Sequence, residues 1–353
     1  MIRKITIALD CMGGDRAPQI VIEGADKAAL LDAGLYFLLF GNSNKIIPII
    51  QNCRNLIDRY EIIHTEDFIS SDEKPSNALR KGTNSSMRLA IDAVKDGRAD
   101  VIVSAGNTGA LMAIAKIVLR CLPSIDRPAI VTSIPNQKKK STVLLDMGAN
   151  IECDADVLFQ FAIMGQAFAH AARKIDKPTI GILNVGSEDL KGNDAVRGAA
   201  AKIRESFLKD SFHGYVEGND ITKGTVDVVV TDGFCGNITL KAIEGTVKLM
   251  SGILKEAFTT SIWSKIGYVL ASSAMNKATK TMDPRMHNGA MLIGLNGVVV
   301  KSHGSTDALG FSNAIKVATS LVDNKINEKI TEELKSCLQS TSSATKESEN
   351  DKK

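Results

Sequence analysis

The chain has 353 residues, of which 44% are hydrophobic and 24% charged, a balance typical of soluble globular proteins. Its formal net charge of +3 gives no reason to expect a nucleic-acid partner, which usually requires a strongly basic face. Six cysteines and five histidines show neither a disulfide framework nor zinc-ligand spacing, so we expect free thiols in a reducing cytoplasm and no metal. The longest uncharged stretch covers 16 residues, 157–172, and is too short for a membrane-spanning helix.

Short β-branched runs alternate with amphipathic segments along the chain. The runs are apolar throughout, which is typical of strands that are covered on both faces of a sheet. The nine runs expected as strands are 5–9, 35–40, 60–63, 101–103, 130–133, 142–145, 179–183, 226–230 and 298–300. The helical patterns between them include 20–33, 86–95, 111–119 and 155–172. This alternation predicts an α/β fold with a doubly wound, mostly parallel sheet.

Residues 241–285 depart from this alternation, because they form one long helical pattern without a strand. The apolar residues of this segment recur at steps of four and three, the spacing of a helical seam. The seam consists of Ile243, Val247, Met250, Leu254 and Ala257. Residues 336–353 are polar and low in complexity, so we expect a disordered tail. The chain is thus expected to form a single α/β domain over 1–335, with 241–285 as a protruding helical segment.

Six of the expected strands run into loops rich in Gly, Asn, Ser, Thr and Asp. These loops are 10–15, 104–109, 146–150, 184–194, 231–237 and 301–307. Turn and cap chemistry alone explains any single loop of this kind. Six such loops at one edge of a parallel sheet favour a ligand site beyond the carboxyl ends of the strands. Glycine lets the backbone approach a ligand there, and helix N-termini offer free N–H groups to an anion.

The kind of ligand is limited by motifs that the sequence lacks. There is no dinucleotide glycine fingerprint, no P-loop and no nucleophile elbow. What remains is polar backbone, several amides, one lysine and one histidine, a set that suits a small anion such as phosphate. We therefore expect phosphate as a ligand and no cofactor.

The loops also carry short motifs in a recognisable order. They are Asp-Cys-Met-Gly-Gly-Asp at 10–15, Ser-Ala-Gly-Asn-Thr-Gly-Ala at 104–110, Lys-Gly-Asn at 191–193, Asp-Gly-Phe-Cys-Gly-Asn at 232–237 and Ser-His-Gly-Ser at 302–305. Each motif alone is weak, whereas the ordered set is specific. From residue 5 to about residue 324, the set strongly resembles the bacterial acyl-carrier-protein:phosphate acyltransferase family.

The resemblance implies a homodimer of Rossmann-like subunits, related in fold to phosphotransacetylase and isopropylmalate dehydrogenase. It implies an enzyme that moves a fatty acyl group from acyl-acyl-carrier protein to inorganic phosphate. The acyl phosphate product would enter phospholipid biosynthesis by passing to a membrane glycerol-phosphate acyltransferase. An acyl-coenzyme A phosphotransacylase and a non-catalytic membrane-surface scaffold are the alternative functions.

In such a reaction phosphate itself is the nucleophile, so the protein has to position a dianion and stabilise the developing oxyanion. Lys191 is the first candidate for the required charge, although a lysine before a helix is more often a solvated loop residue. His303 either orients phosphate and accepts its proton or is structural, and both interpretations stay open. Asn237 is the third catalytic candidate. The candidates for binding phosphate or substrate are Gly13, Gly14, Asn107, Thr108, Gly109, Gly192, Asn193 and Gly236.

The segment 241–285 also carries an apolar cluster next to basic residues. The cluster consists of Ile262, Trp263, Ile266, Tyr268, Val269 and Leu270, and it holds the only tryptophan of the chain. Seven Lys and Arg residues against three acidic residues suit weak attraction to anionic lipid or to an acidic carrier protein. We expect this segment to dimerise the protein and to touch the membrane, with an ordinary buried hairpin as the alternative for the cluster. The expected location is cytoplasmic, with a peripheral position on the inner face of the cell membrane.

Overall fold

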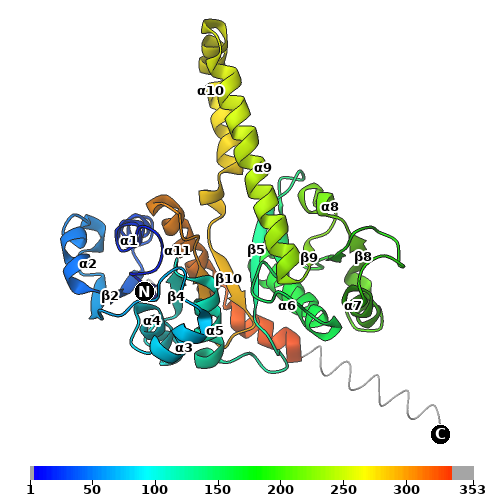
Figure 1. The fold of residues 1–353 in the computed structure, drawn as a ribbon, viewed down its shortest axis with the longest axis horizontal. Coiled ribbons are helices and arrows are strands. Elements are labelled where there is room, and N and C mark those ends of the chain that lie inside the picture. Colours follow the sequence, from blue (N-terminus) through cyan, green and yellow to red (C-terminus); the bar gives the residue numbers. More distant parts are fainter. Residues whose placement is uncertain (1–3, 336–353) are drawn as a thin grey trace.

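The structure of the protein is a computed structural model that describes residues 4–335, apart from the side chains of 276–282. The tail at 336–353, which we expect to be disordered, lies outside the described residues, as do the side chains of Lys277 and Lys280. An elongated α/β body carries two long helices that project from it (Figure 1).

Eleven strands form the sheet of the body, and helices follow most of them along the chain. The strands are β1 (Ile5–Asp10), β2 (Leu35–Gly41), β3 (Tyr60–His64), β4 (Val101–Ser104), β5 (Ala129–Pro135), β6 (Ser141–Leu145), β7 (Ile180–Leu183), β8 (Phe212–Val216), β9 (Val228–Val230), β10 (Ala290–Ile293) and β11 (Val298–Lys301). The α-helices are α1 (Gln19–Leu31), α2 (Ser43–Ile50), α3 (Pro75–Lys81), α4 (Ser86–Lys95), α5 (Thr108–Leu119), α6 (Ala155–Arg173), α7 (Asp194–Arg204), α8 (Gly218–Lys223), α9 (Gly233–Thr259), α10 (Ile262–Met282) and α11 (Ala308–Asp323).

One continuous sheet has the strand order β3-β2-β1-β4-β11-β10-β5-β6-β9-β7-β8. Seven of its ten neighbouring pairs are parallel, which confirms the predicted α/β class with a mostly parallel sheet. The three antiparallel pairs lie together in the middle, between β11 and β10, β10 and β5, and β5 and β6. Because three reversals separate the two halves, β6, β7, β8 and β9 run opposite to β1, β2, β3, β4 and β11.

The prediction of six loops at one edge of the sheet is therefore wrong. The loops after β1, β4 and β11 leave the sheet in one strand direction, whereas those after β6, β7 and β9 leave it in the other. The prediction also lacks β8 and β10. The strand β10 has only one β-branched residue, and β8 lies at the outer edge of the sheet and contains a glycine, so neither gives a strong strand signal.

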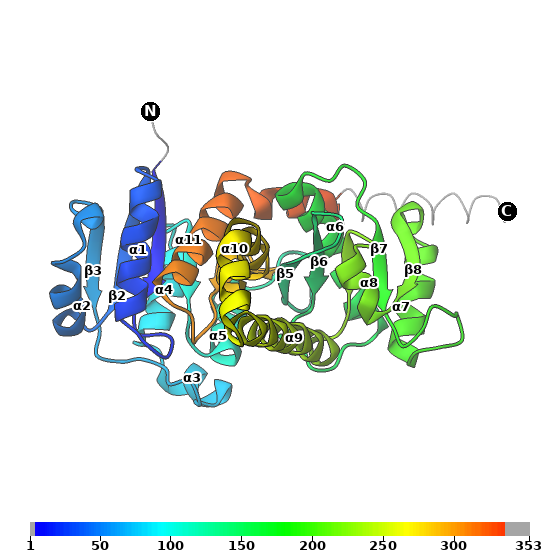
Figure 2. The ribbon, with the colours of Figure 1, turned by 90° about the horizontal axis from the view of Figure 1, so that it is seen from above.

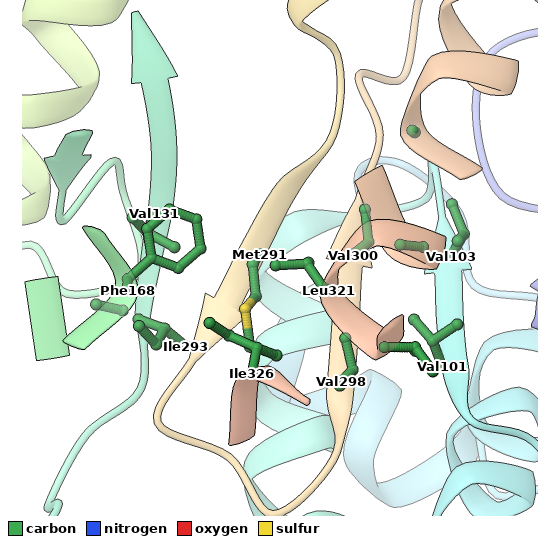
Figure 3. Packing of buried hydrophobic residues seen from close by; sticks show 14 of the residues in the cluster. Val101, Val103, Val131, Phe168, Met291, Ile293, Val298, Val300, Leu321 and Ile326 are labelled. Carbon is green, nitrogen blue, oxygen red and sulfur yellow. The ribbon is translucent and has the colours of Figure 1, made fainter. Parts of the chain in front are cut away.

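Apolar side chains from alternate strand positions pack against helices on both faces of the sheet. One core cluster joins the sheet to α1, α6, α7 and α11, and the other joins it to α3, α4, α5 and α8. Figure 2 shows α6 and α11 on one side of the sheet and α3 and α5 on the other. Where the two halves meet, Met291 and Ile293 of β10 lie among Val131, Phe168 and Ile326 (Figure 3). The hydrophobic core therefore continues across the junction.

The segment 241–285 is predicted as one long helical pattern, but the structure divides it into two helices that form a projecting hairpin (Figure 1). The first helix, α9, begins earlier than predicted, because Asp232 caps it by accepting a hydrogen bond from the Cys235 N–H at 2.7 Å. Ser261 caps α10 in the same way, with the Ser264 N–H as donor at 3.0 Å. Among the described helices, α9 and α10 included, none has both the length and the apolar character needed to span a bilayer.

Candidate active site

Three loops meet beyond the carboxyl ends of β1, β4 and β11. A Cβ atom on Gly14 would lie 3.0 Å from the Ala105 Cβ and 3.2 Å from the Gly304 carbonyl oxygen. Gly14 also has a φ of +105°, a conformation that other residues rarely adopt. A Cβ atom on Gly13 would lie 2.8 Å from the Gly106 nitrogen. Glycine at both positions therefore allows the three loops to come into direct contact.

A buried carboxylate holds these loops from below. Asp10, at the end of β1, accepts hydrogen bonds from Ser86 Oγ at 2.6 Å and from Ser104 Oγ at 2.7 Å. Burial raises the pKa of Asp10, and the hydrogen bonds from the two serines act in the opposite direction. The Asp10 side chain thus ties α4 and β4 to the first loop and is shielded from a ligand.

The first turn of α5 offers free backbone donors next to this contact. Within the described part of the chain, no acceptor contacts the N–H groups of Thr108 and Gly109. A helix N-terminus carries partial positive charge, so these two N–H groups suit an anion. A Cβ atom on Gly109 would lie 2.9 Å from Pro75 Cγ, so glycine at this position also lets α3 approach α5 closely.

Asn107 caps the same helix and is fully occupied by protein groups. Its Oδ1 accepts a hydrogen bond from the Ala110 N–H at 3.0 Å. Its Nδ2 donates to the carbonyl oxygens of Ser71 at 3.0 Å and Glu73 at 2.9 Å. The amide that we expected to donate to phosphate therefore fixes the position of the loop before α3 instead.

The loop after β11 carries His303. Its backbone N–H donates to Asn288 Oδ1 at 2.9 Å, and its ring Nδ1 accepts from the Ser305 N–H at 3.3 Å. We infer that the neutral ring holds its proton on Nε2 and presents a donor. Burial lowers the pKa of His303, and the charges of Lys241 and Lys301 lower it further. A neutral donor is better suited to orienting phosphate than to accepting its proton.

Lys301, the last residue of β11, is a candidate that the sequence interpretation missed. It pairs with Ser104 in the sheet, and its Nζ lies 3.4 Å from the Ala105 carbonyl oxygen and contacts the Ser302 carbonyl oxygen. Burial lowers the pKa of Lys301 to about 8, although the Asp10 carboxylate favours the charged form. The only sequence signal is its place directly after an apolar strand, where a site lysine cannot be told from a solvated one.

The loops after β6 and β9 form a second group. The buried Asp146 carboxylate accepts hydrogen bonds from the N–H groups of Ile130 at 2.9 Å and Gly148 at 3.1 Å. A Cβ atom on Gly236 would lie 1.9 Å from the Asp146 carbonyl oxygen, so the first turn of α9 packs directly on this loop. A Cβ atom on Gly148 would lie 3.5 Å from the Asn237 Cβ. Close packing therefore explains the glycine at 236 without a ligand.

The loop after β7 forms a third group. Lys191 makes an ion pair with Glu188, with 2.8 Å between Nζ and Oε1, and its side chain is 49% exposed. Gly192 has a φ of +93°, and Asn193 caps α7 by accepting a backbone N–H at 2.9 Å. Among the described residues, no hydrogen bond or ion pair joins this loop to those after β1, β4 and β11.

The predicted site residues are thus divided among three places. Those that meet beyond β1, β4 and β11 are Gly13, Gly14, Asn107, Thr108, Gly109 and His303. Gly236 and Asn237 belong to the second group, and Lys191, Gly192 and Asn193 to the third. The helix α9 begins at the second group, and Lys241 in its third turn is near enough to the first group for its charge to lower the pKa of both Lys301 and His303. No cluster of three or more His, Cys, Asp or Glu side chains in the described chain is arranged to hold a metal ion.

Solved structures with a similar fold include a phosphotransacetylase from Streptococcus pyogenes, with a TM-score of 0.60 and 18% identity over 91% of this chain and 94% of that chain. A branched-chain phosphotransacylase from Enterococcus faecalis has a TM-score of 0.56 and 15% identity, over 90% of this chain and 99% of that chain. At this level of identity the likeness defines the fold, which is that of the phosphotransacetylases.

Curated relatives are much closer in sequence. The phosphate acyltransferases of Paramagnetospirillum magneticum and Agrobacterium fabrum are 53% and 50% identical to this chain, each over 94% of its length, and are themselves covered to 95% and 94%. The model of a family described as fatty acid synthesis protein matches residues 5–329. The chain therefore belongs to the phosphate acyltransferase family, as the ordered motifs predict.

The place of Lys301 at the loop that precedes α5 leads to a prediction about pH. With a pKa of about 8, the charged fraction of this amine falls from about 90% at pH 7 to about 10% at pH 9. If the ammonium group attracts phosphate, the KM for phosphate should rise roughly tenfold over this interval.

Two variants provide the comparison for this measurement. Lys301→Arg stays charged throughout the interval, so its KM should be nearly constant between pH 7 and pH 9. Lys301→Met should show a raised KM at both pH values. The ionisation of phosphate itself is common to all three proteins and cancels in the comparison. A wild-type KM that follows the same pH curve as the Lys301→Met protein would exclude Lys301 from phosphate binding.

Proposed function

We propose that this protein transfers a fatty acyl group from acyl-acyl-carrier protein to inorganic phosphate. A phosphate oxygen attacks the thioester carbonyl carbon, the new C–O bond replaces the C–S bond, and the thiolate leaves and takes up a proton. The observation that carries the proposal is a small-anion site formed by the free N–H groups of Thr108 and Gly109, with Lys301 Nζ at the Ala105 carbonyl oxygen of the same loop. Membership of the phosphate acyltransferase family supports the same chemistry.

The chemistry of the acyl phosphate product indicates which kind of enzyme uses it next. An acyl phosphate is an activated anhydride that water cleaves, so a short path to the next enzyme is an advantage. We infer that the product passes to a membrane glycerol-phosphate acyltransferase and enters phospholipid biosynthesis. A position at the membrane surface, with the reaction on its cytoplasmic side, would suit this transfer.

The donor is tested by supplying acyl-carrier-protein and coenzyme A thioesters of the same acyl chain in parallel, with labelled phosphate. We expect labelled acyl phosphate from the carrier-protein thioester, with a kcat/KM at least about tenfold above that for the coenzyme A thioester. The reverse preference would make the protein an acyl-coenzyme A phosphotransacylase. Formation of no acyl phosphate from either thioester would reject the enzymatic function.

Lys191 remains the sequence-derived candidate for a charge on phosphate or on the oxyanion. Replacing it with alanine removes an exposed side chain, so Lys191→Ala should keep the fold and lose on the order of 10²-fold or more in rate. The matched control is Lys202→Ala. Lys202 lies on the neighbouring helix α7 and makes a similar exposed ion pair with Asp156, with 2.8 Å between Nζ and Oδ1. Turnover close to that of Lys202→Ala in a folded Lys191→Ala protein would remove Lys191 from the mechanism.

The helical hairpin supports a proposal of dimerisation and membrane contact. Met250 and Leu254 of the predicted seam are 45% and 40% exposed in the single chain, so a second subunit has apolar surface to cover. Towards the turn of the hairpin, Trp263 and Leu270 are 79% and 83% exposed, which suits the membrane–water boundary and argues against the buried alternative. A monomer in analytical sedimentation would contradict the dimer.

Membrane contact is tested by co-sedimentation with vesicles that contain anionic lipid. Wild-type protein should sediment with the vesicles, and a Trp263→Glu, Leu270→Glu double variant should lose most of this binding, because carboxylates do not enter the lipid interface. A Leu30→Glu, Leu31→Glu variant is the control, since these two leucines are 68% and 78% exposed at the end of α1. Equal binding of all three proteins, or no binding of the wild type, would reject the membrane contact.

A further inference from the structure

One part of the body surface carries more positive charge than the whole chain. We define the basic surface as the exposed Lys and Arg side chains of segments 136–141, 173–179 and 220–227. These side chains are Lys138, Lys139, Lys140, Arg173, Lys174, Lys177 and Lys223. Seven cations against three carboxylates give the surface a net charge of +4, compared with +3 for the entire sequence. The rest of the chain is therefore close to neutral.

Hydrogen bonds hold the three segments of the basic surface together. The Gln137 N–H donates to the Thr222 carbonyl oxygen at 2.9 Å, which joins the turn after β5 to α8. Arg173 Nη2 donates to Ser141 Oγ at 2.8 Å, which joins the end of α6 to the start of β6. The cations therefore lie on one continuous part of the body.

The carboxylates of the basic surface leave most of its positive charge uncompensated. Asp227 accepts from the Thr179 N–H at 3.0 Å, and Asp220 accepts from the Glu217 N–H at 3.0 Å. Lys223 lies 3.6 Å from Asp220. In the described chain it is the only cation of this surface with a carboxylate oxygen within 4.0 Å. Uncompensated charge of one sign attracts a partner of the opposite sign over a distance of about 8 Å in physiological salt.

The sheet places this surface on the same edge as the candidate site. The strands β5 and β11 both run antiparallel to β10, which lies between them, so both end in the same direction. Two strand spacings give a lateral separation of about 10 Å between β5 and β11. The turn with Lys138, Lys139 and Lys140 follows the end of β5, and Lys301 ends β11. The register places Thr132 of β5 level with Lys301, so the end of β5 at Pro135 lies about 10 Å further along the strand direction, and the turn lies beyond it. A macromolecule bound at the turn therefore needs an extended reactive group to reach the loops after β1, β4 and β11.

We propose that the basic surface docks the acidic carrier protein that delivers the acyl thioester. This rests on the proposed function and extends it by assigning the docking site of the donor. Figure 1 shows α8 and the projecting hairpin on the same side of the body. With 27 residues, α9 is about 40 Å long, so a flat bilayer at the far end of the hairpin stays clear of the lysines on the body. A small globular protein, by contrast, fits beside the root of the hairpin.

The proposal is tested by reversing three charges in a Lys138→Glu, Lys139→Glu, Lys140→Glu variant of the full chain. The KM for acyl-acyl-carrier protein should rise about tenfold or more at low salt, because long-range attraction becomes repulsion. The kcat and the KM for phosphate should not change, since these lysines are outside the candidate site. The KM for a small acyl thioester without a carrier protein should also stay the same. Binding of carrier protein alone, measured by fluorescence anisotropy, should weaken by a similar factor.

The matched control is a Lys27→Glu, Lys45→Glu, Lys95→Glu variant, which changes the net charge equally with exposed lysines of the other half. It should keep the wild-type KM and the wild-type affinity for carrier protein. Equal effects in the two variants would show a response to net charge and would overturn the proposal. If the triple variant at Lys138, Lys139 and Lys140 binds carrier protein as tightly as the wild type does, the proposal is overturned as well. If that variant loses vesicle binding, the basic surface is assigned to lipid instead.

The outcomes separate this proposal from the proposed function. If small thioesters are converted to acyl phosphate while carrier binding is unchanged in the variant, the enzyme assignment stands and the docking site is wrong. If carrier protein binds the wild type and not the variant, while no thioester yields acyl phosphate, the docking site stands and the enzymatic reaction is wrong.

Discussion

The pairing of β10 with both β11 and β5 is the interaction on which the rest of this structure depends. These backbone hydrogen bonds join two parallel half-sheets that run in opposite directions, and the apolar side chains of Met291 and Ile293 continue the core across the junction. The same strand follows the hairpin of α9 and α10 along the chain. The hairpin thus starts after β9 in one half and ends where the two halves meet.

This arrangement decides which loops act together. Loops after β1, β4 and β11 gather around Gly14 because their strands are neighbours with the same direction. The loop with Lys191 follows a strand of the reversed half, and it has its own ion pair with Glu188. Lys301, by contrast, lies at the loop after β4, where its Nζ is 3.4 Å from the Ala105 carbonyl oxygen. Membership of the family therefore gives the class of reaction. The directions of the strands show which loops can lie together.

The apolar runs of the sequence predict nine of the eleven strands, because strands buried on both faces need side chains such as those of Val101 and Val298. Strand direction is beyond such a prediction, since β5 and β6 show the same apolar pattern as the parallel strands. The residues of the candidate site could likewise be predicted only in part. Glycine at 13 and 14 indicates close backbone approach correctly, but the sequence does not tell whether the amide of Asn107 faces a ligand or the carbonyl oxygens of Ser71 and Glu73.

The capping of α5 has a consequence for how an anion is selected. Asn107 bonds the helix on one side and the loop before α3 on the other, so contacts within the protein alone hold the first turn of α5 in place. Gly109 against Pro75 limits movement from the opposite direction. A preorganised pair of N–H groups loses little conformational entropy on binding, and its spacing is fixed in advance. For an anion bound at this turn, selectivity would be set by the geometry of the anion, whose oxygen atoms would have to match the spacing of the two donors.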